Sequence, residues 1–253
     1  MPETIRTLKG KRKITALTAY DYSMAKILSR AGVDILLVGD SLGMVVLGYR
    51  NTHFVTLDDM IRHGQAVVRG NKGSLVVIDM PIGTCDTPEK AVENCRRACE
   101  ETGARTVKIE GKAESVRAVC QAGISVMGHT GLKPQEVTKY TVQGGDSDSR
   151  KRVLDEAKAL ESAGAFSLIL ECVPSDLGRE VTELLSIPVI GIGAGPHADG
   201  QILVSHDMLG FSSDIRPRFV RRYADLSETI FSAVKRYNED VRNGDYPAES
   251  ESY

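Results

Sequence analysis

The segment "ILLVGD", residues 35–40, is an unbroken run of apolar residues that ends in a glycine and a carboxylate. Short continuous apolar runs are typical of strands that are covered on both faces, as in parallel sheets. Such a strand has no structural need for Asp40 at its end. The segment therefore raises two questions, namely what covers the strand and what the carboxylate does.

The same pattern recurs along the whole chain. Apolar runs alternate with stretches of helical character, and the last apolar run is "QILVSHD". The predicted strands are 14–20, 35–40, 75–81, 106–111, 124–129, 167–173, 188–195 and 201–207, and the predicted helices are 22–31, 57–69, 88–102, 113–122, 150–163, 176–185 and 219–242. Eight strands that alternate with helices in about 250 residues match one α/β domain, a (β/α)8 TIM barrel. An open, doubly wound sheet is the alternative.

Local signals mark the ends of several predicted helices. Thr56 precedes "LDDM", Thr87 is followed by Pro88, and Ser149 precedes "RKRVLDEAKALESAG", which ends at Gly164. Hydroxyl side chains cap helix N-termini, proline suits the first turn, and glycine commonly follows the last turn. We therefore expect these residues to bound their helices.

The composition is that of a globular protein. The 253 residues are 42% hydrophobic, and the formal net charge is -2 with acidic and basic residues intermixed. This balance gives no electrostatic footprint for nucleic acid or an anionic membrane. The first residues lack the apolar core of a secretory signal, and no segment approaches the ~20 apolar residues that span a bilayer. We expect a cytoplasmic protein with one domain over residues 1–253, in which 243–253 is a flexible acidic tail.

The five cysteines do not indicate a disulfide framework or a zinc ribbon, because their number is odd and no C-x-x-C pair occurs. Cys95 and Cys99 lie one helical turn apart, and two thiols at that spacing could in principle share a metal. We expect them instead to be reduced residues packed on one face of a helix.

Charged or polar residues close several of the predicted strands: Asp40, Asp79, Lys108, Glu110, His129 and Glu171. Any one of them alone is explained as a helix cap or a turn residue. In a TIM barrel, however, the carboxyl ends of all strands meet at one mouth. Four carboxylates at one mouth repel each other unless a cation lies among them, and oxygen donors without grouped Cys or His favour Mg²⁺.

Lys108 lies two residues before Glu110, so both side chains point to the same side of the strand. Its ammonium group either neutralises the carboxylates or holds an anionic substrate. The residue pattern leaves both roles open.

Nine blocks of sequence together resemble the ketopantoate hydroxymethyltransferase family, in order and with little gapping from about residue 14 to residue 247. They are "TAYDYSMAKI", "LLVGDSLGMVVLGY", "VTLDDMIRHGQAVVRG", "DMPIGT", "VKIEG", "GHTGLKPQ", "LILECVP", "IPVIGIGAGPHADGQILVSHDMLG" and "PRFVRRY". The resemblance implies a (β/α)8 barrel of the phosphoenolpyruvate/pyruvate type. It also implies a homo-oligomer, since the family tends to form decamers.

The resemblance assigns roles to the residues at the strand ends. It implies Mg²⁺ ligands at Asp40, Asp79 and Glu110. The keto-acid contacts that it implies are Asp40, Ser41, Asp79 and Lys108. The general base falls on Glu171. His129 matches a position that lines the same pocket, and the alternative for it is an imidazole tied into a hydrogen-bond network.

The implied activity is transfer of a hydroxymethyl group to 3-methyl-2-oxobutanoate (2-oxoisovalerate), giving 2-dehydropantoate in pantothenate biosynthesis. The implied co-substrate is 5,10-methylenetetrahydrofolate, so the expected partners are a small 2-oxo acid and a folate. A 2-oxo acid can chelate Mg²⁺, and the ion stabilises the negative charge that develops when C3 loses its proton. We expect Glu171 to remove that proton.

Some positions depart from the family pattern. Thr141 and Gly145 stand where the family commonly has a lysine and a basic residue, "NTHFVT" replaces "TTLPVT", and Ala198 stands where cysteine is frequent. These departures leave the folate contacts open and touch none of the metal or base positions. Two alternatives remain: an Mg²⁺-dependent C–C lyase of the same barrel superfamily, and a non-catalytic barrel that binds a keto acid.

Overall fold

The computed structural model describes residues 2–137, 140–211 and 217–253. The chain forms two compact units, one ending at Val204 and one running from Ser205 to Tyr253, and each is described by itself. The prediction of one domain with a flexible acidic tail stays a prediction.

The first unit is a closed barrel of eight parallel strands in which each strand pairs with its neighbours in sequence and β8 pairs with β1. The strands are β1 (Ile14–Thr18), β2 (Ile35–Val38), β3 (Leu75–Asp79), β4 (Thr106–Glu110), β5 (Ser125–Gly131), β6 (Ser167–Glu171), β7 (Val189–Ile192) and β8 (Gly200–Leu203). The prediction of a TIM barrel is confirmed, and the open sheet is wrong.

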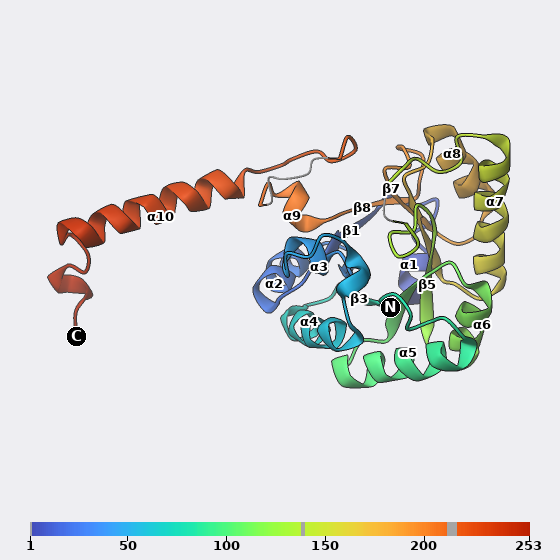
Figure 1. The fold of residues 1–253 in the computed structure, drawn as a ribbon, viewed down its shortest axis with the longest axis horizontal. Helices are drawn as coiled ribbons and strands as arrows, with labels where there is room; N and C mark the ends of the chain where they lie inside the picture. The colour runs from blue at the N-terminus through green and yellow to red at the C-terminus, as the bar shows by residue number, and fades with distance from the viewer. Residues whose placement is uncertain (1, 138–139, 212–216) are drawn as a thin grey trace. The chain divides into compact units, whose positions relative to one another are not determined.

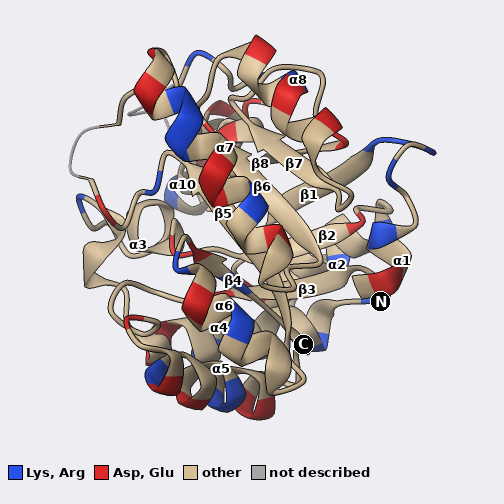
Figure 2. Cartoon of the chain, turned by 90° about the vertical axis from the view of Figure 1, so that its right-hand side faces the viewer, with Lys and Arg blue, Asp and Glu red and all other residues tan. Residues whose placement is uncertain are grey.

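Helices surround this barrel (Figure 1). They are α2 (Tyr22–Arg30), α3 (Leu42–Val45), α4 (Leu57–Gly70), α5 (Pro88–Thr102), α6 (Ala113–Gln121), α7 (Ser147–Ser162) and α8 (Ser175–Leu184), with a 3₁₀ turn η1 (Thr52–Phe54). The short α1 (Pro2–Arg6) instead packs Ile5 against the interior of the barrel. Figure 2 shows that acidic and basic residues alternate over the outer helices, most clearly on α5. The intermixed acidic and basic residues of the sequence therefore lie on the solvent-exposed faces of the outer helices.

Two apolar clusters hold the first unit together. The larger one fills the layer between the strands and the helices. The smaller one fills the inside of the barrel, where it consists of Ile5, Ile14, Ala16, Ile35, Leu37, Leu75, Val77, Met127, Phe166, Ile169, Ile190 and Ile202. Because Ile14, Ile35 and Leu75 are the first residues of their strands, this cluster occupies the amino-terminal part of the barrel.

The second unit contains α9 (Ser205–Met208), α10 (Leu226–Asn243) and a 3₁₀ turn η2 (Glu249–Glu251). Asp225 caps α10 by accepting a hydrogen bond from the Glu228 N–H, and Gly244 ends it in the left-handed conformation. No residue of α10 is buried. No helix within the described ranges has the length and apolar character needed to cross a bilayer.

Most of the predicted helix ends agree with the structure, including the caps at Thr56 and Thr87. The prediction for Ser149 is wrong. The helix α7 begins at Ser147, and its cap is Asp146, whose carboxylate accepts hydrogen bonds from the Asp148 and Ser149 N–H groups. An ionised carboxylate accepts these bonds more strongly than a hydroxyl, so the helix begins earlier and Ser149 becomes the reciprocal member of a capping box.

The predicted last helix, 219–242, also begins too early. The helix α10 starts at Leu226, because the Tyr223 N–H donates to the Met208 carbonyl oxygen and directs the preceding segment away from helical geometry. The predicted strand 201–207 ends at Leu203, and its last residues belong to α9. All five cysteines are free thiols, as predicted.

Candidate active site

The register of the barrel brings the charged strand ends level with each other. Asp79 of β3 pairs with Lys108 of β4, and Glu110 of β4 pairs with His129 of β5. On the next strand Gly131 of β5 pairs with Glu171 of β6. The strand ends therefore lie side by side, as their shared position at the carboxyl ends of parallel strands predicts.

Asp40 joins this group from the turn after β2. Its backbone N–H donates to Asp79 Oδ2 at 3.2 Å, and its side chain is buried. Ser41 follows at the start of α3, and its hydroxyl lies 2.8 Å from the Tyr20 hydroxyl in a hydrogen bond. The carboxylate at the end of "ILLVGD" thus belongs to a buried polar cluster.

Lys108 lies between two of the carboxylates. Its Nζ donates to Asp79 Oδ1 and Oδ2 at 2.9 and 2.8 Å and to Glu110 Oε1 at 3.1 Å. All three side chains are buried, so the Coulomb attraction within each pair is screened less than in surface pairs. Lys108 therefore partly neutralises the buried carboxylates, which is one of the two roles that the sequence leaves open.

His129 connects the buried cluster to Glu171. Its Nδ1 lies 3.1 Å from Glu110 Oε1, and its Nε2 lies 3.3 Å from Glu171 Oε2 without the alignment of a hydrogen bond. The Glu171 side chain is 18% exposed, whereas that of His129 is 1% exposed. Glu171 is therefore the most accessible member of this chain of contacts.

The backbone fixes Glu171 tightly. The Leu132 N–H donates to the Glu171 carbonyl oxygen at 2.8 Å. Gly131 has a φ of 90°, and a Cβ at this position would collide with the same carbonyl group. A glycine is required here because of this close approach. Cys172, directly after Glu171, adopts a φ of 53°, which is uncommon for a side-chain-bearing residue and is typical of functional sites.

Burial and mutual repulsion shift the pKa values in this cluster. Burial, then the charge of Asp79, raises the pKa of Asp40 well above its usual range, and Lys108 only partly offsets this. Burial also raises the pKa of Asp79, against the attraction of Lys108. Burial opposes ionisation of Glu110 too, but Lys108 and His129 outweigh it and lower its pKa to about 2.

The cationic members shift in the opposite sense. Burial and nearby Lys108 both oppose protonation of His129, but its contacts with Glu110 and Glu171 outweigh them and raise its pKa to about 9. Burial likewise opposes the charge of Lys108, and the three surrounding carboxylates raise its pKa nonetheless. The site therefore holds charged groups of both signs away from water, which is typical of catalytic centres.

The donor set suits a hard divalent ion. Asp40, Asp79 and Glu110 offer buried carboxylate oxygens, and burial raises the pKa values of Asp40 and Asp79 despite the nearby Lys108. Within the described residues, however, no group of three or more His, Cys, Asp or Glu side chains has the arrangement of a metal site. Lys108 lies between Asp79 and Glu110 instead, so the predicted ligand set stays a prediction.

Comparison with known proteins decides the family. The family model described as ketopantoate hydroxymethyltransferase matches residues 2–249. The chain belongs to the ketopantoate hydroxymethyltransferase family. A protein of Salinibacter ruber named 3-methyl-2-oxobutanoate hydroxymethyltransferase is 51% identical over 259 residues, which cover 99% of this chain and 98% of that protein. A protein of Syntrophomonas wolfei with the same name is 49% identical over 97% of this chain and 91% of its own length.

Solved structures show the same barrel. That of 2,3-dimethylmalate lyase, a PEP mutase/isocitrate lyase superfamily member, has a TM-score of 0.63 and 17% identity over 100% of this chain and 91% of that chain. Phosphonopyruvate hydrolase in complex with oxalate and Mg²⁺ has a TM-score of 0.64 and 12% identity over 99% and 92%. These likenesses confirm the (β/α)8 barrel fold of this ketopantoate hydroxymethyltransferase family member.

Sequence reasoning for this family member missed Gln135. Its side-chain Nε2 donates to Asp40 Oδ2 at 3.1 Å, and its backbone N–H donates to Glu110 Oε2 at 3.3 Å. The residue is uncharged and lies in a loop, so neither a strand end nor a charge drew attention to it. The available signal was its place in the "GHTGLKPQ" block, six residues after His129.

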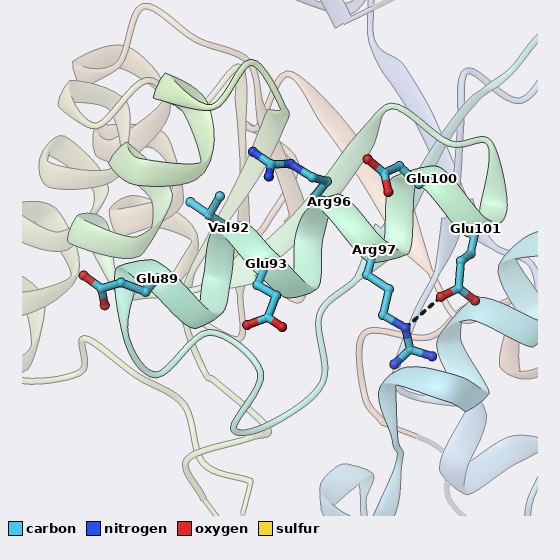
Figure 3. A pocket seen from close by; sticks show the side chains of 7 residues that line it. All are labelled: Glu89, Val92, Glu93, Arg96, Arg97, Glu100 and Glu101. Atoms are coloured by element: carbon cyan, nitrogen blue, oxygen red, sulfur yellow. Dashed lines mark hydrogen bonds and ion pairs between the residues drawn. The ribbon is translucent and has the colours of Figure 1, made fainter.

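A surface hollow of about 470 Å³ lies along α5, away from these strand ends. Figure 3 shows its lining residues, which are Glu89, Val92, Glu93, Arg96, Arg97, Glu100 and Glu101. Arg97 pairs with Glu101 at 2.7 Å on this solvated face. Intermixed charges on one exposed helix are typical of a surface, so we assign the chemistry to the strand ends instead.

Proposed function

We propose that the protein transfers a hydroxymethyl group from 5,10-methylenetetrahydrofolate to 3-methyl-2-oxobutanoate and thereby forms 2-dehydropantoate. Family membership over nearly the whole chain supports this activity. The observation that carries it in the structure is the partly exposed Glu171, connected through His129 to a buried group of three carboxylates and one lysine. This arrangement supplies a base beside a site that suits an anionic, chelating substrate.

The residues have distinct proposed roles. Asp40, Asp79 and Glu110 would hold Mg²⁺, which when bound supplies the Lewis acidity that polarises a keto group. Asp40, Ser41, Asp79 and Lys108 would contact the keto acid, with the Lys108 ammonium attracting its carboxylate. His129 would pair electrostatically with the Glu171 carboxylate at 3.3 Å, since its imidazole is fixed by Glu110 at its other nitrogen.

In the reaction, Glu171 would accept the proton from C3 of the keto acid. The electron pair of that C–H bond then forms a new C–C bond to the methylene carbon of the folate. Water provides the hydroxyl group, and tetrahydrofolate leaves. The burial of the strand-end charges keeps water away from the developing negative charge, where fixed dipoles and cations act most strongly.

Solvent exchange at C3 tests the role of Glu171. In D₂O with Mg²⁺, the wild type should replace the C3 hydrogen of 3-methyl-2-oxobutanoate by deuterium, as followed by proton NMR. Glu171→Gln should slow this exchange by about 10²- to 10⁴-fold, because it removes the base and keeps the shape. Glu183→Gln, on the exposed part of α8, is the matched control and should exchange at the wild-type rate.

Two results would contradict the proposal separately. Normal exchange by Glu171→Gln would remove Glu171 from the role of base. A wild-type protein that forms no 2-dehydropantoate from the keto acid and methylenetetrahydrofolate would refute the activity itself.

We further propose a cytoplasmic homo-oligomer, as the family resemblance implies. The apolar side chains of α10 support an assembly, since Ile230, Phe231 and Val234 are exposed on a helix without buried residues. The mass in solution from light scattering tests the assembly, and a monomeric mass would contradict it.

A further inference from the structure

Gln135 contacts groups that belong to three different strand ends. Its side-chain Nε2 donates to Asp40 Oδ2, after β2, at 3.1 Å and to the Met80 carbonyl oxygen, after β3, at 3.0 Å. Its backbone N–H donates to Glu110 Oε2, at the end of β4, at 3.3 Å. A primary amide has two N–H donors, and here each has its own acceptor, so the orientation of the amide is fixed.

The segment that carries Gln135, residues 132–136, is itself held on several sides. The Leu132 N–H donates to the carbonyl oxygen of Glu171 at 2.8 Å. The Pro134 carbonyl oxygen lies 3.0 Å from His53 Nε2 in a hydrogen bond. Lys133 Nζ pairs with Glu156 Oε1 of α7 at 2.9 Å. Because the segment is fixed to β6, η1 and α7, Gln135 can impose a position on the groups that it contacts.

Asp40 is the carboxylate that most needs such support. Asp79 and Glu110 lie at strand ends and are both paired with Lys108. Asp40 lies in the turn after β2 instead, and among the residues that the structure describes, Gln135 provides the hydrogen bond to its carboxylate. A buried carboxylate without a donor is costly.

We propose that Gln135 is a positioning residue, which holds the Asp40 carboxylate in the orientation that binds the keto acid and the metal ion. The inference rests on the proposed function, in which Asp40 contributes to both sites. It gives an uncharged residue of the loop after β5 a role in the affinity for the ligands.

Two variants separate hydrogen bonding from space filling. Gln135→Met has a similar length but no donors, and Gln135→Glu keeps the shape but turns an acceptor toward Asp40 and the Met80 carbonyl. Both keep the backbone N–H that contacts Glu110. The matched control is Gln65→Met, which removes a side-chain amide that donates to the Glu101 carbonyl oxygen at 3.0 Å between outer helices.

The measurements are the Kd of Mg²⁺ for the ligand-free protein by calorimetry, and KM and kcat for the keto acid, all well below the thermal midpoint of each variant. Gln135→Met should raise both the Kd and the KM by roughly ten- to hundred-fold, the effect of one lost hydrogen bond to a charged group. Gln135→Glu should raise them further. Gln65→Met should leave both unchanged.

A merely structural role predicts a different pattern. Loss of folded protein lowers kcat while KM and Kd stay the same, and a space-filling role predicts a nearly normal Gln135→Glu protein. Either pattern, or a Gln135→Met protein whose Kd and KM stay within about twofold of wild type, would overturn the inference. A wild type that neither binds Mg²⁺ nor turns over the keto acid would instead refute the proposed function.

Discussion

The two ends of the barrel interior are built from the same strands and contain opposite chemistry. At the amino-terminal end, Ile14, Ile35 and Leu75 lie in an apolar cluster that also includes Ile5 of α1. At the carboxyl end the interior holds Lys108 and its carboxylate partners, all buried. Burial of apolar side chains stabilises a fold, whereas burial of charges costs free energy unless they are paired.

The change from one chemistry to the other occurs within single strands. On β3, Leu75 and Val77 belong to the interior cluster, and the next inward residue is Asp79. On β5 the order is Met127 and then His129. Side chains of a strand point inward at every second residue. The last inward position of these strands therefore carries a charged or polar group, while the earlier inward positions carry the apolar side chains of the interior cluster.

The largest expected effect comes from breaking the charge balance of the carboxyl end. Lys108→Met keeps the length of the side chain but leaves Asp79 and Glu110 buried without their cation. We expect a loss of about 3–5 kcal/mol in the free energy of unfolding, measured in urea, together with loss of turnover. Added Mg²⁺ should restore more stability to this variant than to the wild type.

An exposed ion pair gives the control for Lys108. Lys112 pairs with Asp86 near the surface, so Lys112→Met should cost less than about 1 kcal/mol. Equal losses in the two lysine variants would show that burial does not distinguish the carboxyl end from the surface.

The second effect is a pH dependence of stability that originates in His129. Its pKa in the folded protein is raised from 6.5 to about 9, so proton binding favours the folded state. This stabilisation is complete below pH 6.5 and is lost as the pH rises through about 9. Urea unfolding in metal-free buffer should therefore show a loss on the order of 3 kcal/mol across this range, which His129→Gln lacks.

A histidine outside the cluster provides the comparison. His197 lies 2.8 Å from Arg179 in a hydrogen bond, far along the chain from the charged strand ends. His197→Gln is therefore the matched substitution outside the cluster. A His129→Gln protein with the wild-type slope would show that His129 is not the group that titrates.

The strands were predictable because each is a continuous apolar run, and the strand-end residues were predictable because parallel strands end at one edge. The first residues of helices were less predictable, since Asp146 and Ser149 both carry capping groups and only the backbone geometry decides which of them caps the helix. Gln135 was not predictable from its own chemistry. Its contacts join segments up to 95 residues apart, and no local pattern encodes such a contact.

The smallest effect tests the apolar end. Ile190 of β7 is buried in the interior cluster, and its Cδ1 would lie 2.7 Å from a Cβ placed on Gly200, so this methyl group covers the glycine. Ile190→Val removes that methyl and should cost about 0.5–1.5 kcal/mol of unfolding free energy, with KM and kcat for the keto acid unchanged. Ile27→Val, at an exposed position on α2, should leave the stability nearly unchanged. A change in KM caused by Ile190→Val would mean that the two ends of the barrel are coupled, because a packing defect among apolar residues would then reach the charged groups at the mouth.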